Sequence, residues 1–233
     1  MTGMATTNRR FKDDIFEQFA RIGKAVASAK RIELLDLLSQ GERHVEVLAE
    51  AAGISVANAS QHLQILRAAR LVETEKSGVF VTYRLADRSV AEFVRQLRML
   101  AEKRLAEVEQ TARTFIEGRI GFDPVNREEL LQRVRKGEVT VLDVRPAEEF
   151  RAGHLPRALS VPLEELEALM KDLPKDREIV AYCRGPYCVM AVEAVARLRE
   201  QGFRAIRLDL GVLDWQARGL PVEMAAGARV KRN

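Results

Sequence analysis

The chain has 233 residues, of which 47% are hydrophobic and 31% charged, and its net charge is +4. This length predicts one or two domains, and so small a net charge does not by itself indicate a nucleic-acid partner. No apolar run approaches the ~18–20 residues of a membrane span, and the first residues lack the apolar stretch of a secretory signal. We therefore expect a cytoplasmic protein with no membrane partner.

The first half of the chain is predicted to be mainly helical. Apolar spacing indicates a helix that includes residues 16–26 and further helices over residues 29–38, 45–52 and 56–69. Serine precedes two of these helices, at Ser28 and Ser55, and is expected to cap each of them. Glycine follows two of them and is expected to end them.

A β-hairpin and a long helix are predicted next. Residues 72–75 and 79–85 alternate as strands do, and residues 76–78 are expected to form the turn between them. Ser89 and Glu92 have the spacing of a capping box, which would open a helix that continues to about residue 116.

Two helices joined at a glycine and followed by a hairpin form a winged helix-turn-helix arrangement, which places its second helix in the DNA major groove. Ala59, Leu63 and Leu66 would face the core, leaving polar side chains outside that can bond base edges or phosphates. A purely structural use of the motif is the alternative, and His62 has a second interpretation as a surface histidine that bonds a phosphate or a neighbour. The candidate DNA-binding residues are Ser55, Asn58, Ser60, Gln61, His62, Gln64, Arg67, Lys76 and Arg84.

Residues 54–72, which read ISVANASQHLQILRAARLV, resemble the recognition-helix signature of ArsR-type bacterial repressors. The resemblance implies a homodimeric winged-helix regulator that binds an imperfect palindrome in double-stranded DNA. It also implies that the first and last helices form the dimer, and the last predicted helix carries a suitable apolar stripe. That stripe consists of Val90, Phe93, Val94, Leu97, Leu100, Ala101, Leu105 and Val108. The alternative is that it packs only within its own domain.

The chain departs from the metal-sensing members of that family, which carry cysteines before the recognition helix or histidines on the last helix. Residues 42–48 contain no cysteine, and the last helix of this half contains no histidine. His44 is therefore interpreted as a surface residue, and we predict no metal site and no cofactor.

The pattern changes after the glycines and the proline of residues 117–126. Strands then alternate with helices, which predicts a mostly parallel sheet covered on both faces, with ligands bound at the carboxyl ends of its strands. The predicted strands are residues 139–144, 158–161, 178–182 and 205–208, and the predicted helical segments are residues 126–136, 147–152, 163–172, 189–201 and 212–218.

Both cysteines of the chain, Cys183 and Cys188, lie in the loop between the third of these strands and the helix that follows. Main-chain N–H groups and the helix dipole at such a turn favour the thiolate, and Arg184 adds positive charge. In the cytosol a cysteine pair indicates catalysis, redox chemistry or metal binding more often than a structural crosslink. We therefore expect at least one reactive, solvent-reachable thiolate.

This half resembles the rhodanese family. Residues 142–145 match its early aspartate-arginine motif, residues 153–158 its Gly-His-Ile-Pro-Gly-Ala motif, and residues 215–221 its C-terminal signature. The resemblance implies that Cys183 is the active cysteine and carries sulfane sulfur as a persulfide, a form of nucleophilic catalysis. The six residues from Cys183 to Cys188 fit sulfur transfer, whereas related phosphatases and arsenate reductases use a longer loop. The remaining active-site loop residues are Arg184, Gly185, Pro186, Tyr187 and Val189.

The loop departs from the family in its fourth, sixth and seventh places, where Pro186, Cys188 and Val189 stand. The usual arginine for an anionic donor is missing, so Arg145 and Arg184 are the candidate anion-binding residues. A small sulfur donor or a low-molecular-weight thiol is the expected partner. Cys188 is either a small apolar residue at a helix start or a resolving thiol, which requires the two Cα atoms to lie within about 7 Å.

We predict a winged helix-turn-helix DNA-binding and dimerisation domain over residues 1–118, a linker over 119–125, an α/β rhodanese-like three-layer domain over 126–225 and a tail over 226–233. The favoured function is a regulator, most simply a repressor, that forms a persulfide on Cys183 to sense or transfer sulfur. The alternatives are a sulfurtransferase whose winged helix serves dimerisation, and a thiol-based response to arsenic.

Overall fold

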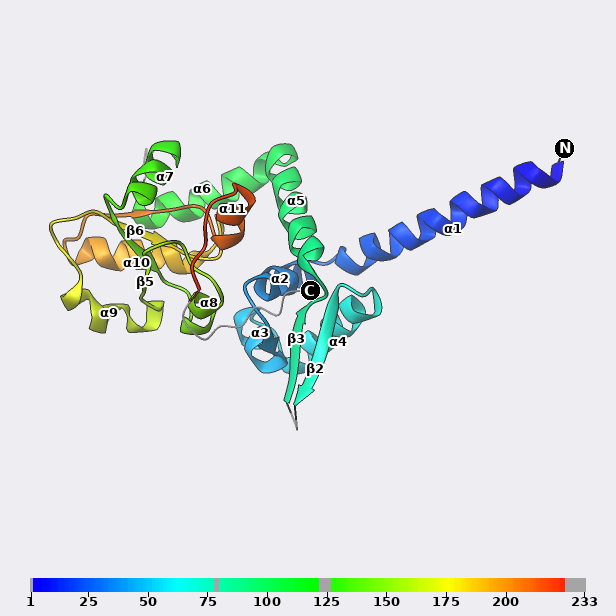
Figure 1. Ribbon diagram of the computed structural model, residues 1–233, viewed down its shortest axis with the longest axis horizontal. Helices are drawn as coiled ribbons and strands as arrows, with labels where there is room; N and C mark the ends of the chain where they lie inside the picture. The colour runs from blue at the N-terminus through cyan, green and yellow to red at the C-terminus, as the bar shows by residue number, and fades with distance from the viewer. Residues whose placement is uncertain (1, 78–79, 122–126, 225–233) are drawn as a thin grey trace. The chain divides into compact units, whose positions relative to one another are not determined.

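The computed structural model describes residues 2–77, 80–121 and 127–224. The chain divides into two compact units, residues 1–101 and 102–233, so the division lies earlier than the linker expected at residues 119–125. Figure 1 shows the helices and strands of both units. None of the described helices combines the length and apolar content needed to cross a membrane.

The first unit is a mainly helical winged helix-turn-helix, as predicted. Its three-stranded antiparallel sheet has the order β1-β3-β2, and the short strand β1 was not foreseen. The elements are α1 (Thr2–Val26), α2 (Ala29–Ser39), β1 (Arg43–His44), α3 (Val45–Ala51), α4 (Val56–Ala68), β2 (Val72–Ser77), β3 (Phe80–Leu85) and α5 (Arg88–Arg104), the last of which extends past the unit's end.

Apolar residues at helical spacing build the core of this unit. Leu34, Leu35 and Leu38 of α2 meet Leu63 and Leu66 of α4 in one buried cluster. Leu63 and Leu66 lie on one face of α4, and their burial in this cluster turns that face towards α2. The opposite face of α4 is thereby left outside the core.

The helix caps agree with the sequence analysis only in part. The Ser55 hydroxyl accepts a hydrogen bond from the Asn58 N–H at 3.2 Å and caps α4, as expected. Ser28 occupies the N-cap position of α2, but its side chain makes no capping bond. The capping box at Ser89 was wrong, because α5 begins one residue earlier and the Asp87 carboxylate accepts the Ser89 N–H at 2.6 Å.

Two predicted boundaries also differ. The strand β2 continues to Ser77, so Lys76 and Ser77 lie in a strand rather than in the turn, while Gly78 and Val79 fall outside the described residues. The helix expected to run unbroken to residue 116 is two helices, because Leu105 has an extended backbone with φ −116° and ψ 101°. After it α6 (Ala106–Ile120) begins, and α6 belongs to the second unit.

The second unit is an α/β domain with a wholly parallel four-stranded sheet of order β5-β4-β6-β7, as predicted. After α6 its elements are α7 (Arg127–Lys136), β4 (Thr140–Asp143), α8 (Ala147–Ala152), β5 (Leu159–Ser160), η1 (Leu163–Glu165), α9 (Leu166–Leu169), η2 (Met170–Asp172), β6 (Ile179–Tyr182), α10 (Val189–Glu200), β7 (Ala205–Arg207) and α11 (Val212–Ala217). The N-cap expected at Asn126 lies outside the described residues.

Alternating side chains of the buried strands divide the core into two layers. Ile179 and Ala181 of β6 join the cluster that also holds Ile120 of α6 and residues of α10. Val180 and Tyr182 point the other way, into the cluster that holds Trp215. The result is a three-layer domain in which α6 and α10 cover one face of the sheet and the cysteine loop follows the end of β6 (Figure 1).

Candidate functional site

The helix α4 presents a polar face that is available for recognition. Asn58, Gln61 and Gln64 are exposed, whereas Ala59 and Leu63 on the opposite side are fully buried. The Ser55 hydroxyl, also a candidate, serves as the helix cap. These short side chains suit contacts with base edges and phosphates.

The remaining DNA-binding candidates of this unit differ in solvent exposure and in whether their side chains already have partners. Arg67 and Lys76 are exposed, and Ser60 is half-buried. The Arg84 guanidinium lies 2.5 Å from the carboxylate of Glu73, so its charge is compensated within the hairpin. His62 is half-buried, and its Nδ1 atom is shielded from solvent without a hydrogen-bond partner among the described residues.

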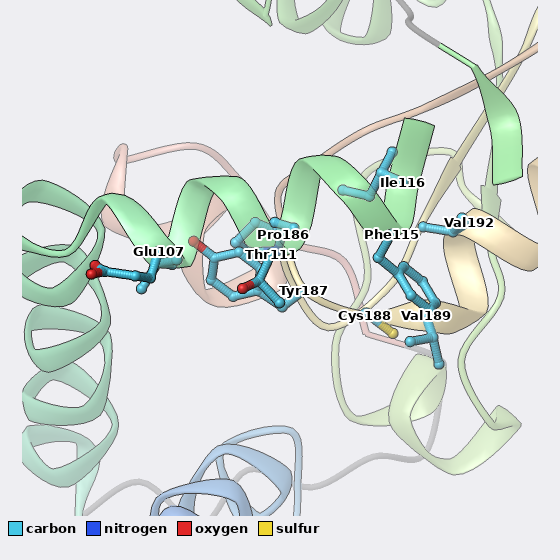
Figure 2. Close-up of a pocket in the computed structure, with 11 residues that line it drawn as sticks. Glu107, Thr111, Phe115, Ile116, Pro186, Tyr187, Cys188, Val189 and Val192 are labelled. Carbon is cyan, nitrogen blue, oxygen red and sulfur yellow. The ribbon is translucent and has the colours of Figure 1, made fainter. Parts of the chain in front are cut away.

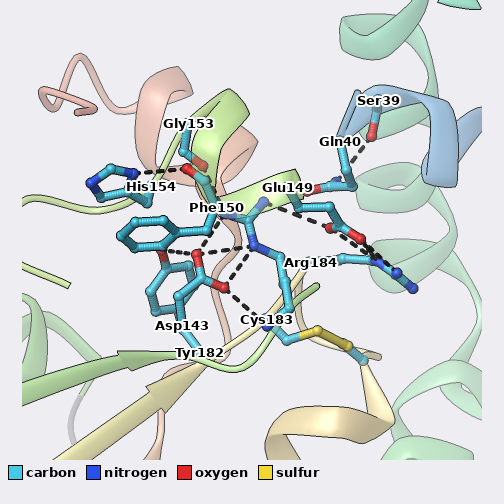
Figure 3. Close-up of polar contacts among 12 residues, drawn as sticks. Ser39, Gln40, Asp143, Glu149, Phe150, Gly153, His154, Tyr182, Cys183 and Arg184 are labelled. Atoms are coloured by element: carbon cyan, nitrogen blue, oxygen red, sulfur yellow. Dashed lines mark hydrogen bonds and ion pairs between the residues drawn. A yellow bond between two sulfur atoms is a disulfide. The ribbon is translucent and has the colours of Figure 1, made fainter. Parts of the chain in front are cut away.

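The cysteine loop joins β6 to α10. Cys183 directly follows the last residue of β6, and Cys188 is the N-cap residue of α10. Their sulfur atoms form a disulfide, with the two Cα atoms 6.1 Å apart (Figure 3). The loop therefore brings the two cysteines within the distance that the resolving-thiol interpretation requires.

This arrangement corrects one expectation about Cys183. Its side chain is only 1% exposed, lies in the core cluster on the α10 side of the sheet and is disulfide-bonded. In this form Cys183 is not a thiolate, because its sulfur is bonded to Cys188. It is also not reachable from solvent, because it directly follows the buried strand β6 and its side chain packs in the core. Cys188, which is only partly buried, occupies the helix N-terminus instead.

The loop is braced by its own backbone and by neighbouring segments. The Cys188 N–H donates to the Gly185 carbonyl oxygen at 3.2 Å, and the Arg207 side chain donates to the Pro186 carbonyl oxygen at 2.8 Å. Gly211 packs so closely on the loop that a Cβ atom there would clash with the carbonyl oxygen of Arg184. Glycine is needed at position 211 for this close approach.

A buried charge network supports the adjoining strands (Figure 3). The guanidinium of Arg145 lies 2.6 Å from the carboxylate of Asp143 and also donates to the Gly153 carbonyl oxygen at 2.7 Å. The Tyr182 hydroxyl donates to Asp143 and accepts the Leu155 N–H at 3.0 Å. Buried charged groups are stable only when they are paired and hydrogen-bonded in this way.

The network shifts the pKa values of two of its members. Burial chiefly, and then the charge of Asp143, raise the pKa of Tyr182 well above its usual value, so the phenol stays protonated. Burial alone would lower the pKa of Arg145, but the hydrogen bond and charge of Asp143 outweigh burial and raise it. Both side chains therefore hold fixed charge states at physiological pH.

The two candidate anion-binding residues are already paired with carboxylates. Arg184 lies 2.7 Å from Glu149, whose second oxygen lies 3.8 Å from Arg145 (Figure 3). Arg145 is also almost wholly buried. Neither guanidinium is placed to bind an anionic sulfur donor, so the structure gives no support to the expected anion site.

Sequence reasoning missed Glu149, Gly211 and Tyr182. Glu149 stands beside Glu148 on a short helix, and only the tertiary contacts distinguish the buried carboxylate from the exposed one. Tyr182 immediately precedes Cys183, which was the one available signal that it lines the base of the loop.

The side chain of His154, in the second unit, contacts Phe150 and is not part of a group of metal ligands among the described residues. The His154 ring stacks on Phe150 with centroids 3.7 Å apart, and its Nδ1 lies 2.8 Å from the Phe150 carbonyl oxygen. Within the described parts of the chain, no group of three or more His, Cys, Asp and Glu side chains is arranged to hold a metal ion.

An apolar cavity of about 510 Å³ lies between α6 and the cysteine loop (Figure 2). Val108, Ala112 and Phe115 of α6 line one side, and Pro186, Tyr187 and Cys188 of the loop line the other. This volume is within the range of small-molecule sites.

Family models match both units. The model described as "Bacterial regulatory protein, arsR family" matches residues 28–74, and the model described as "Rhodanese-like domain" matches residues 126–218. The chain is 44% identical to an HTH-type transcriptional regulator of Mycobacterium tuberculosis over 215 residues, which cover 92% of this chain and 94% of the relative.

Two further relatives match one unit each. The chain is 34% identical to a sulfurtransferase of Allochromatium vinosum over 105 residues, which cover 44% of this chain and 96% of the relative. A solution structure of the homodimeric winged helix-turn-helix DNA-binding domain of a possible ArsR-family regulator from Mycobacterium bovis is 40% identical. That match covers 40% of this chain and 87% of the solved chain, with a TM-score of 0.39.

Proposed function

Because the chain belongs to the ArsR family of bacterial regulatory proteins and carries a C-terminal rhodanese-like domain, we propose that it is a transcriptional repressor regulated by sulfur chemistry at Cys183. The observation that carries the proposal is the presence in one chain of the exposed polar face of α4 and a two-cysteine loop at the end of β6. One feature suits operator binding, and the other suits a reversible covalent signal.

The repressor acts as a homodimer. Phe16 and Phe19 of α1 are 66% and 63% exposed, and Leu100 of α5 is 56% exposed. Large apolar side chains that cluster on a surface mark an interaction site. A dimer formed through α1 and α5 places two copies of α4 on the two halves of a palindromic operator.

The signal is a persulfide. The Cys183–Cys188 disulfide must first be reduced, because a sulfur in a disulfide is not a nucleophile. Cys183 is 1% exposed in the disulfide form, so the opened loop must also expose its sulfur. The thiolate of Cys183 then attacks the outer sulfur of a persulfide donor, the sulfur–sulfur bond of the donor breaks, and the donor leaves as a thiolate. Cys183 retains the transferred sulfur, and the changed loop alters the affinity of the dimer for its operator.

The test uses the reduced full chain and DNA from upstream of its own gene. Exposure to glutathione persulfide should add about 32 Da to the protein and change operator affinity by about fivefold or more. Cys183→Ser should bind the operator yet show neither effect, whereas Cys188→Ser, which cannot form the disulfide, should still gain sulfur. An equal response in Cys183→Ser, or no change in operator affinity in the native chain, would overturn the proposal.

A second candidate function is sulfur transfer as the main activity, favoured by the similarity of the second unit to a curated sulfurtransferase. Under this reading the first unit serves dimerisation. Repeated transfer of sulfur from a persulfide to an added thiol, together with absence of specific DNA binding, would favour it over the repressor.

A further inference from the structure

We propose that the cavity between α6 and the cysteine loop binds an apolar low-molecular-weight thiol, which opens the disulfide by attacking the sulfur of Cys188. The proposal deepens the proposed function, on which it rests, because it names the class of reductant that returns Cys183 to its thiolate form. It is carried by the lining of the cavity and by the unequal burial of the two sulfurs.

The lining of the cavity selects for an uncharged organic group. Val108, Ala112 and Phe115 of α6 line the cavity together with Pro186 of the loop and Val189 of α10. Figure 2 shows the Phe115 and Val189 side chains close to each other. Burial of apolar ligand surface against such side chains is favourable.

The described cavity lining contains one carboxylate, and the guanidinium groups beside the lining are engaged with other partners. Glu107 lines it, and the Tyr187 hydroxyl, also in the lining, donates to Glu102 at 3.0 Å. The guanidinium of Arg184 is paired with Glu149, that of Arg207 donates to the Pro186 carbonyl oxygen, and that of Arg119 lies over the Phe115 ring. An anion such as thiosulfate would have to lose its hydration against this mostly apolar lining, so the cavity favours a neutral apolar thiol.

Access decides which sulfur is attacked. Cys188 is partly buried and lines the cavity, whereas Cys183 is 1% exposed within the core cluster. The helix dipole at the N-terminus of α10 favours Cys188 as the leaving thiolate by about fivefold, and by about thirtyfold in the most favourable partly buried geometry. A sulfur enclosed by side chains offers no path for the collinear approach that thiol–disulfide exchange requires, so burial outweighs the dipole.

The exchange is balanced without any further oxidant. The thiol loses its proton to water, and its thiolate forms a bond to the Cys188 sulfur while the bond between Cys188 and Cys183 breaks. The sulfur of the incoming thiol is oxidised to a mixed disulfide on Cys188, and Cys183 is reduced and released as a thiolate. The product holds the nucleophile that the proposed persulfide step needs.

The first experiment maps the attack. The full chain in its disulfide form is treated with 2-phenylethanethiol, quenched with iodoacetamide and digested with trypsin. Cleavage after Arg184 separates Cys183, in residues 178–184, from Cys188, in residues 185–197. We expect the phenylethyl adduct on the second peptide and the alkyl label on the first. The reverse assignment would overturn the proposal.

The second experiment tests the cavity. The rate with 2-phenylethanethiol should exceed that with anionic 2-mercaptoethanesulfonate by about tenfold or more, after each is normalised to its rate with a small disulfide in free solution. Ala112→Trp, which fills the cavity, should remove this preference, while Gln110→Trp on an exposed position of α6 should keep it. Val108→Phe serves as a second filling variant if Ala112→Trp does not fold.

The outcomes separate the two proposals. Equal normalised rates for the two thiols in the native chain would overturn the cavity assignment while leaving persulfide formation by the reduced chain intact. Conversely, selective attack on Cys188 by the apolar thiol, with no effect of persulfide on operator affinity, would support the cavity site and overturn the regulatory proposal.

Discussion

Three side chains beside the cysteine loop, Asp143, Arg145 and Tyr182, form a hydrogen-bonded group that is almost completely removed from solvent. The charge of Arg145 is tolerated there because the Asp143 carboxylate pairs with it and the Gly153 carbonyl oxygen accepts a further hydrogen bond. Tyr182 completes the group, since its hydroxyl links that carboxylate to the backbone N–H of Leu155. The cysteine loop therefore starts from a rigid base.

Tyr182→Phe should lower the free energy of unfolding of the second unit by about 1–3 kcal/mol, because it leaves the buried Leu155 N–H without its acceptor and removes one donor to Asp143. The single tryptophan, Trp215, is buried in this unit, so its fluorescence during urea unfolding of the full chain reports the loss. Tyr83→Phe, in the core of the first unit, is the control and should leave that transition unchanged. An unaltered transition in Tyr182→Phe would contradict the expectation.

The sign of the pH dependence follows from the raised pKa of Tyr182. Its contribution to stability is complete below the ordinary tyrosine pKa of about 10 and is lost as the pH rises through the higher pKa of the folded protein. The same urea measurements above pH ~10 should therefore show the native chain losing a stabilisation that Tyr182→Phe never had.

At the scale of elements, the burial of apolar side chains decides two features: which face of α4 points outward, and where α5 ends and α6 begins. The buried stripe of α4 orients its polar face outward. The α6 helix packs its Phe115, Ile116 and Ile120 against the cluster of the second unit instead of continuing α5. Local periodicity is helical on both sides of Leu105, so only the packing partner reveals the break.

Arg67→Gln should weaken operator binding about equally across sequences and reduce the log–log salt slope by about 1, because the exposed guanidinium on the last turn of α4 is expected to neutralise one phosphate. Fluorescence anisotropy with operator DNA over a salt series measures the slope. Arg113→Gln, which removes an exposed arginine of α6, should leave it unchanged. The same slope in Arg67→Gln and the native chain would exclude a phosphate contact.

At the scale of the whole molecule, the exposed apolar side chains of α1 call for a partner. Phe11, Phe16 and Phe19 of α1 are all exposed. The helix α1 extends past the rest of its unit (Figure 1). A monomer that left them in water would lose the stabilisation that burial of aromatic rings supplies. In the proposed homodimer a second copy of the chain would cover these rings, because the same surface occurs on both subunits.

The double change Phe16→Glu and Phe19→Glu should raise the dissociation constant of the proposed dimer by at least about hundredfold, because it removes from each subunit two rings that the dimer would bury and places like charges together. Sedimentation velocity over a concentration series measures the shift, and operator affinity should fall with it. Arg10→Glu, which adds negative charge to α1 outside this apolar set, is the matched control. A double variant that stays dimeric would show that α1 is not the interface.

The sequence by itself determined most of the elements and their order; the short strand β1 and the break at Leu105 were the exceptions. Helical and strand periodicities are local properties, so the winged helix-turn-helix, the alternating strands and helices of the second unit and the position of the cysteine loop could all be predicted. The two family resemblances followed from short contiguous motifs for the same reason.

Only the tertiary structure decided what surrounds the loop. Cys183 is buried in the core, whereas Cys188, to which it is disulfide-bonded, lines the cavity. Glu149 pairs with Arg184, which lies 35 residues further along the chain, and Gly211 packs against the backbone of the loop. Such contacts join segments that are distant in the chain, so the local sequence around a residue does not predict them. Burial, charge compensation and the space for a ligand are properties of the assembled core, which is why the chemistry expected of this loop depends on the fold.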